Sequence, residues 1–312
     1  MQPAFSVIFF TVSTGTGYGL LFLLGLLGAA GKLPADHTFG FIGMALGLAL
    51  VGAGLLSSML HLGHPERAWR ALSQWKTSWL SREGVASVIS FVPGLAMMYL
   101  WVFESTSHPM FALFGLATAL MAFVTVYCTA MIYRSLPPIH QWANGWTLPN
   151  YLFMGLAGGG VVLVGLYGVV GAPLTLAPIC AVGALFVAWG VKSGYWRFID
   201  NSKSQSTAET ATGLGHIGKV TQMESPHTED NYLLKEMGFQ IGRKHGNKLR
   251  RYANVLTFLL PILLLGATQQ TTGYVSSGLS LLAVLSFALG AITERWLFFA
   301  QAEHTVTLYY GR

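Results

Sequence analysis

Charged residues are scarce in this sequence. They make up 10% of its 312 residues, whereas a typical soluble domain has about 25%. Together with 53% hydrophobic residues and a mean hydropathy of +0.54, this scarcity excludes an ordinary soluble globular protein. Several apolar runs reach the ~18 residues or more that a helix needs to cross a bilayer. The composition therefore predicts an all-α, polytopic membrane protein.

Cysteine is scarce as well. The two cysteines, Cys128 and Cys180, lie far apart inside apolar runs, without the short spacings typical of zinc or iron–sulfur ligands. We expect no metal site on this chain, so any cluster involved in its function would lie on another subunit. No basic–aromatic module accompanies the sequence pI of 9.3, which argues against nucleic acid as a partner.

Eight apolar runs have the length of membrane spans, and together they predict one membrane domain over residues 1–312. A hydrophilic insertion, residues 196–251, separates spans six and seven and is too polar to be core. The predicted spans are Ser6–Ala30, Gly40–Leu62, Gly84–Phe103, Met110–Tyr133, Tyr151–Val170, Leu174–Tyr195, Tyr252–Gln269 and Val275–Ala300.

The distribution of lysine and arginine predicts the orientation. With eight spans, both termini share one side of the membrane with the loops after spans two, four and six. Of the 18 basic residues, only Lys32 falls on the other side. Because basic residues concentrate on the cytoplasmic side of membrane proteins, we expect both termini and the polar loops, including the long one, to be cytoplasmic.

Basic residues also gather just before span seven. An amphipathic segment, Thr228–Ile241, precedes them and has the apolar spacing of a surface helix. The cluster suits either anionic membrane lipid headgroups or the docking of a cytoplasmic partner, and these two interpretations are compatible. Its members are Arg243, Lys244, Lys248, Arg250 and Arg251.

A polar cluster lies at the end of span two. His61 is expected in the last turn of that span, because Pro65 prevents the helix from continuing. The loop that follows carries tryptophans such as Trp69, which favour the membrane interface. Since a short loop joins antiparallel helices, Arg82 and Glu83 return to the same level at the start of span three.

This arrangement predicts a proton-exchange site. Histidine titrates near neutrality, and partial burial can raise the pKa of Glu83 toward that range. Reduction of a quinone needs two protons with two electrons, at a site that a lipid-soluble ring can reach. Alternatively, His61 only stabilises the C-terminal end of its helix, where the helix dipole favours a histidine. Arg67 is expected to hold the loop, to orient a carboxylate or to anchor lipid headgroups, and His64 is expected to face a docked partner or water.

Motifs in two parts of the sequence resemble those of a known family. Around the polar cluster they are Ser58-Met-Leu-His-Leu-Gly63 with Pro65 and Arg67-Ala68, and then Leu80-Ser81 with Glu83. Near the C-terminus they are Arg295 in the last span and His304-Thr-Val306 after it. The chain resembles the membrane anchor subunits of dimethyl sulfoxide reductase, within the wider group that includes the polysulfide reductase membrane subunit.

The resemblance implies a function. Anchors of this family sit in the bacterial cytoplasmic membrane and bind ubiquinone or menaquinone as a diffusible substrate. They carry no haem or cluster and dock an iron–sulfur electron-transfer subunit, which connects them to a molybdopterin catalytic subunit. The quinone-site histidine and glutamate of the family correspond to His61 and Glu83.

The long insertion points to a subgroup. It is longer than in the dimethyl sulfoxide reductase anchors. Its stretches Ser206-Thr-Ala-Glu-Thr and Pro226–Ile241 resemble the anchors of cytoplasmic sulfite-oxidising molybdenum complexes, in which sulfite is oxidised and quinone reduced. The alternative is an anchor of a reductase of dimethyl sulfoxide or polysulfide, which oxidises quinol.

Two other classes remain less favoured. A haem b cytochrome needs two histidines on facing helices, and only His61 is well placed on a span. A secondary transporter is expected to have ionisable residues near the membrane centre and inverted repeats. The ionisable residues Glu294 and Arg295 of span eight are interpreted instead as a structural pair or a loop anchor, which does not favour a transporter.

Overall fold

The computed structural model describes residues 3–60, 62–172, 176–202, 204, 206–224 and 244–310, and the elements found there are helical. They are α1 (Phe5–Ala29), α2 (His37–Met59), η1 (Pro65–Leu72), α3 (Trp79–Phe103), α4 (Pro109–Arg134), α5 (Thr147–Val170), α6 (Ala177–Asn201), α7 (Ala208–Thr212), α10 (Gly246–Asn254), η2 (Val255–Leu259), α11 (Leu260–Ala267), η3 (Thr268–Gln270), α12 (Gly273–Ala300) and η4 (Thr305–Tyr310).

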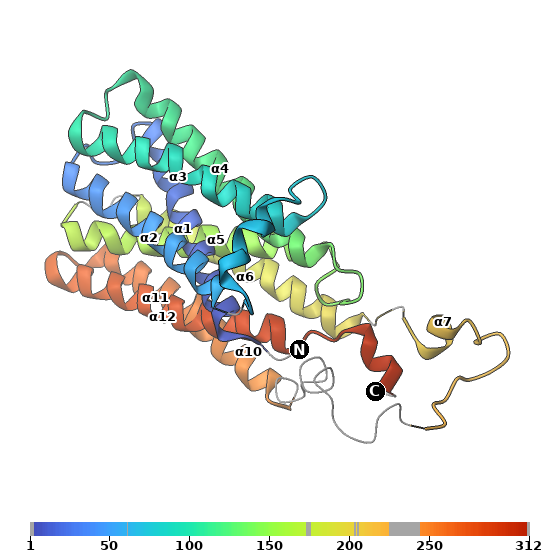
Figure 1. The fold of residues 1–312 in the computed structure, drawn as a ribbon. Coiled ribbons are helices and arrows are strands. Elements are labelled where there is room, and N and C mark those ends of the chain that lie inside the picture. Colours follow the sequence, from blue (N-terminus) through green and yellow to red (C-terminus); the bar gives the residue numbers. More distant parts are fainter. Residues whose placement is uncertain are drawn as a thin grey trace.

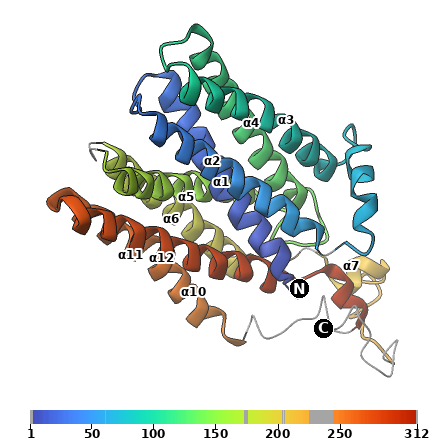
Figure 2. The same ribbon diagram turned by 60° about the vertical axis from the view of Figure 1, so that its left-hand side comes forward.

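Within the part of the sequence that the structure describes, 8 helices are long and apolar enough to cross a membrane, as predicted. The seventh runs over Gly246–Gln270 and comprises α10, η2, α11 and η3. Figure 1 and Figure 2 both place the two termini, η1 and α7 at one end of the helix bundle. We call this the loop end.

Several predicted span ends are wrong by a few residues. Helix α2 ends at Met59, before the predicted Leu62. Helix α3 begins earlier than predicted, at Trp79, where the Ser78 side chain accepts a hydrogen bond from a backbone N–H of the first turn. Helix α6 continues to Asn201 and α10 begins at Gly246, so both ends of the predicted insertion, residues 196–251, are helical. Hydropathy does not detect these polar helix ends because they extend past the apolar runs.

Helix α1 forms the centre of the bundle and packs against α2, α4, α5 and α12. Glycines permit its closest approaches. A Cβ atom on Gly19 would overlap the carbonyl oxygen of Gly155 on α5, and one on Gly25 would overlap that of Gly115 on α4. Glycine thus lets these helices pack closely, as small residues commonly do between membrane helices.

The seventh span departs from α-helical geometry near its middle. Residues Val255–Leu259 form a π-helical turn just before Pro261. Proline lacks an N–H, and its ring collides with the carbonyl four residues earlier, so a wider turn relieves the clash. Helix α12 lies against this turn, with Gly290 so close to Thr257 that a Cβ atom would not fit.

Candidate functional site

Glu83 lies inside the bundle, one turn into α3 at the loop end. Its side chain is buried, with the residue only 4% exposed. The Thr129 hydroxyl on α4 donates a hydrogen bond to Glu83 Oε1 and also lies 3.0 Å from the Thr125 carbonyl oxygen. A carboxyl group with one side-chain donor, enclosed by apolar helices, is suited to holding and exchanging a proton.

A row of hydroxyl groups extends from this site along α3. Ser90 donates to the Ser87 carbonyl oxygen at 2.7 Å, so the Tyr18 hydroxyl on α1 donates to Ser90 Oγ at 3.1 Å. Ser87 lies one helical turn after Glu83 on α3. The surroundings of Glu83 are therefore polar on the side that faces α1 and α4.

The loop before α3 is fastened to the start of that helix. The Ser81 hydroxyl donates to the Ala71 carbonyl oxygen, and Leu72 lies against Gly84. Arg82 donates to the Trp75 carbonyl at 2.9 Å and to the Lys76 carbonyl at 2.6 Å. Arg82 thus holds the loop rather than facing Glu83.

Other predicted site residues lie on the exposed surface of this loop. His64 Nδ1 is 3.0 Å from Glu66 Oε1, and Arg67 Nε is 3.6 Å from the same oxygen. Trp69 is 67% exposed and lies beside Arg70, whose Cζ is 5.7 Å from its ring centroid. The structure does not bring these side chains to Glu83. His61, the predicted partner of Glu83, lies outside the described residues.

The predicted docking residues lie around α10, and they differ in accessibility. Arg250 is turned toward the bundle, where it bonds Asp200 at 2.7 Å and Gln301 Oε1 at 3.0 and 3.2 Å. Three of the others line an open cavity of about 530 Å³, namely Lys244, Lys248 and Arg251. Arg243 and the segment 228–241 lie outside the described residues.

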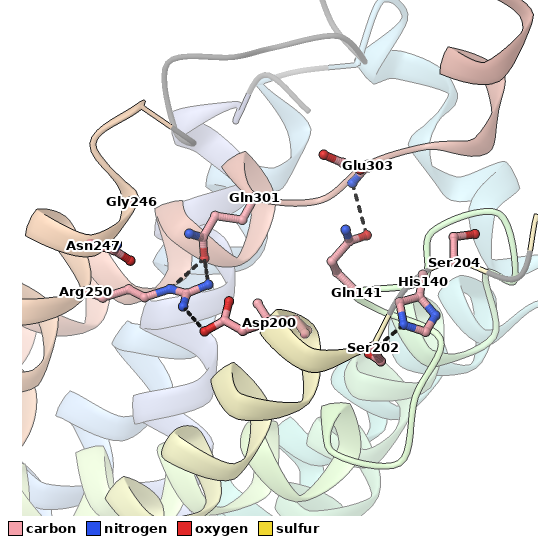
Figure 3. A pocket seen from close by; sticks show the side chains of 11 residues that line it. His140, Gln141, Asp200, Ser202, Ser204, Gly246, Asn247, Arg250, Gln301 and Glu303 are labelled. Carbon is pink, nitrogen blue, oxygen red and sulfur yellow. Dashed lines mark hydrogen bonds and ion pairs between the residues drawn. The ribbon is translucent and has the colours of Figure 1, made fainter. Parts of the chain in front are cut away.

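Figure 3 shows a second open cavity at the loop end, of about 470 Å³. One side of the cavity is formed by Arg250, Asp200 and Gln301, and the other side by His140 and Gln141. His140 Nε2 is 2.8 Å from Ser202 Oγ, and Gln141 Oε1 accepts from the Glu303 N–H at 3.1 Å. The cavity is polar, and it connects α6, α10 and the end of α12 with the loop before α5.

Sequence reasoning missed a second buried polar site. Lys192 on α6 is 0% exposed, and on α12 Glu294 is 0% and Arg295 3% exposed. Lys192 Nζ forms an ion pair with Glu294 Oε1, and Arg295 Nε lies 3.7 Å from Glu294 Oε2. We call these three residues the ion cluster. The available signal was a single lysine inside the apolar run of span six.

Among the residues that the structure describes, no group of three or more histidine, cysteine, aspartate or glutamate side chains could hold a metal ion. The groups present at the loop end are instead suited to moving protons and to pairing charges. The fold and these sites together define a polytopic helical membrane protein with ionisable groups buried near one face.

The protein belongs to the DMSO reductase anchor subunit (DmsC) family, whose model matches residues 1–311. It is 35% identical over 327 residues to a sulfite dehydrogenase subunit of Allochromatium vinosum, with 99% of both sequences covered. It is 30% identical to an anaerobic dimethyl sulfoxide reductase subunit of Escherichia coli, over 58% of this sequence and 65% of that one. The corresponding subunit of Haemophilus influenzae is 30% identical, over 49% of this sequence and 54% of that one.

The predicted family and the predicted class of membrane protein are therefore confirmed. The protein is a membrane anchor subunit of oxidoreductase complexes. The full-length match to a sulfite dehydrogenase subunit favours the predicted subgroup over the dimethyl sulfoxide reductase anchors, which match in part.

Proposed function

We propose that this protein is the quinone-reactive anchor in a complex of three subunits that oxidises sulfite and reduces quinone. An iron–sulfur subunit would deliver the electrons, and a molybdopterin subunit would oxidise sulfite. Sulfite and water give sulfate, two electrons and two protons, whereas quinone takes two electrons and two protons to become quinol. The buried carboxyl group of Glu83, at the loop end beside the membrane interior, is the observation that carries the proposal.

Glu83 supplies protons to the quinone site. It is buried on α3 where this helix packs against α4, and its oxygen is held by the Thr129 hydroxyl. Release of its proton leaves a carboxylate that Thr129 continues to stabilise. His61 would hydrogen-bond a quinone carbonyl oxygen and provide the other proton, since imidazole titrates near neutrality.

The loop between α2 and α3 has a supporting role. Arg82 fixes it by two bonds to backbone carbonyls. The exposed side chains of His64 and Arg67 both lie beside the Glu66 carboxylate and face a docked subunit or water. Trp69 lies at the membrane interface. These side chains shape the entrance to the site and take no part in proton transfer.

The loop end faces the cytoplasm in this proposal. Apart from Lys32, and from Lys192 and Arg295 inside spans six and eight, the basic residues of the sequence belong to segments predicted on that side of the membrane. The iron–sulfur subunit would therefore dock on the loop end, close to Glu83, in the bacterial cytoplasmic membrane. Lys244, Lys248 and Arg251 offer it positive charge beside anionic lipid.

Glu83→Gln tests the site in the assembled complex. The amide keeps the size of the side chain but does not exchange a proton, so we expect sulfite-dependent quinone reduction to fall about 100-fold or more. The same complex should still oxidise sulfite with a soluble dye as electron acceptor. The measurement compares the two rates in purified complexes.

Glu66→Gln is the matched control, because Glu66 is a carboxylate of the same region that lies on the exposed loop surface. It should leave both rates unchanged. Normal quinone reduction in Glu83→Gln would contradict the site, and a complex that oxidises quinol but never sulfite would favour the reductase alternative.

A further inference from the structure

The ion cluster lies within the membrane-spanning part of the bundle. Lys192 and Glu294 are each roughly two turns inside the loop-end terminus of their helices. Charges at such depth are costly, and a buried ion pair often stabilises a fold no better than apolar side chains of the same size. A purely structural role therefore explains the cluster poorly, and ionisable groups in this setting commonly serve proton or ion movement.

Two tyrosines connect the ion cluster with the surroundings of Glu83. The Arg295 Cζ atom lies 4.0 Å from the ring centroid of Tyr151 on α5. Tyr151 stacks on Tyr133 of α4, with ring centroids 5.5 Å apart and an interplanar angle of 17°. Tyr133 follows Thr129, the residue bonded to Glu83, by about one helical turn. A row of buried polar side chains thus crosses the bundle from α3 to α12.

A small cavity adjoins this row. It has a volume of about 20 Å³, enough for one water molecule, and Tyr151, Glu294 and Arg295 line it together with Thr11 and Thr16 of α1. Within the described residues, neither the Tyr151 hydroxyl nor Arg295 Nη1 makes a direct hydrogen bond of good geometry. Buried polar groups in this state are usually satisfied by water, which also conducts protons.

The ion cluster is also connected to the open cavity of Figure 3. Lys192 Nζ lies 4.3 Å from the ring centroid of Tyr195. The Tyr195 hydroxyl donates to the Gln141 carbonyl oxygen at 3.1 Å, and Gln141 lines the cavity. The Tyr195 side chain therefore connects the buried Lys192 with the open cavity at the loop end.

We propose that the ion cluster is a second proton-exchange site, which passes protons from the open cavity at the loop end to the quinone site at Glu83. This inference rests on the proposed function and names a further site for it. Lys192 gives up one proton and becomes a neutral amine, while Glu294 and Arg295 remain an ion pair, so the charge of the cluster falls from +1 to zero. The proton passes by way of water and the two tyrosines to Glu83, which has given its own proton to the quinone. A proton from the open cavity then restores Lys192.

The charged and titratable groups that face Lys192 come from several helices. Those that act on it electrostatically are Glu294 and Arg295 of α12 and Arg250 of α10, and Tyr195 of α6 lies against it.

Lys192→Arg separates a proton-exchange role from a structural one. Arginine keeps the positive charge and the partner Glu294, but it does not deprotonate in proteins. We expect quinone reduction to fall at least tenfold, with dye-linked sulfite oxidation and the yield of complex unchanged. A structural role predicts wild-type quinone reduction in this variant.

A paired variant, Lys192→Met with Glu294→Gln, covers the case in which arginine does not fit. It removes one charge of each sign, so the net charge of the cluster stays at +1 through Arg295. We expect slow quinone reduction and a changed pH profile. Ser286→Ala is the control, since it removes from α12 a buried hydroxyl that donates to the Leu256 carbonyl and does not titrate.

The outcomes separate this inference from the proposed function. A wild-type rate and pH profile in the paired variant, with Glu83→Gln inactive, would overturn only the second site. A wild-type complex that reduces no quinone would overturn both. If neither cluster variant assembles, infrared difference spectra of quinone reduction provide the test. A carboxylate band that shifts in Glu294→Asp supports the site, and the absence of such a band refutes it.

Discussion

Gly19 lies where α1 crosses α5, and the approach of the two backbones leaves no room for a side chain. A Cβ atom there would overlap the Gly155 carbonyl oxygen and crowd the Gly159 N–H. We expect Gly19→Ala to force the two helices apart and to destabilise the subunit by roughly 1–3 kcal/mol, the usual cost of overpacking. The thermal unfolding midpoint of the purified protein measures this effect.

Gly15 provides the control for that prediction. It lies one turn earlier on α1, and a Cβ atom at this position would meet no heavy atom within 4 Å. Gly15→Ala should therefore leave the midpoint unchanged or raise it slightly, because alanine favours the helix. Equal effects of the two substitutions would contradict the assigned packing.

Individual residues show which parts of the site can be predicted from the sequence and which cannot. Glu83 stood out because it follows a polar loop and opens an apolar run, and its burial near the loop end agrees with that interpretation. Its partner Thr129 could not be found, since the register of α3 against α4 depends on tertiary packing. Lys192 was overlooked, and its pairing with Glu294 connects residues about 100 positions apart that only the fold brings together.

The C-terminal element illustrates how a short segment is held at the loop end. His304 pairs with Ile139 in an isolated β-bridge, and the Thr305 N–H donates to the Pro138 carbonyl oxygen at 2.9 Å. His304 Nδ1 accepts from the Val306 N–H at 3.0 Å, which requires that this nitrogen carries no proton. Burial lowers the pKa of His304 below the usual imidazole value.

This lowered pKa predicts that docking of the segment depends on pH. The undocked segment binds a proton more readily than the docked one, so the contribution of His304 to docking is present above about pH 6.5 and is lost as the pH falls through the lowered pKa. Amide hydrogen exchange over residues 302–310 should be faster at pH 5 than at pH 7.5, after correction for the intrinsic rate.

His304→Gln removes the titrating group and should abolish this difference. The exposed His216, changed in the same way, is the control and should leave it intact. An unchanged difference in His304→Gln would show that another group controls the segment.

Helices were predicted more accurately in their number than in their ends. The apolar runs predicted the eight spans that are found among the described residues, because hydropathy reports what the bilayer requires. The polar turns of α3, α6 and α10 extend beyond those runs and are stabilised by caps and side-chain contacts instead. The bond between Arg250 of α10 and Asp200 of α6 is one such contact. These interactions depend on the fold, and a hydropathy pattern does not contain them.

Over the whole molecule, charge is distributed unevenly between the two ends. Both termini, η1 and α7 lie at the loop end in Figure 1, together with the basic surface formed by Lys244, Lys248 and Arg251. The opposite end carries Lys32 as its one predicted basic residue. The same asymmetry that orients a membrane protein would also attract an acidic partner or anionic lipid, and an experiment can separate these two.

Reversal of this basic surface, by changing Lys244, Lys248 and Arg251 to glutamate, tests its role in docking. We expect the yield of co-purified iron–sulfur subunit to fall about tenfold, equivalent to roughly 1.4 kcal/mol. The difference from the wild type should shrink at higher salt, because salt screens both the attraction in the wild type and the repulsion in the variant. Lys32→Glu, at the opposite end, should leave this yield unchanged. Full co-purification combined with weaker binding to vesicles that contain anionic lipid would instead assign the surface to the membrane. If neither property changes, the surface has neither role.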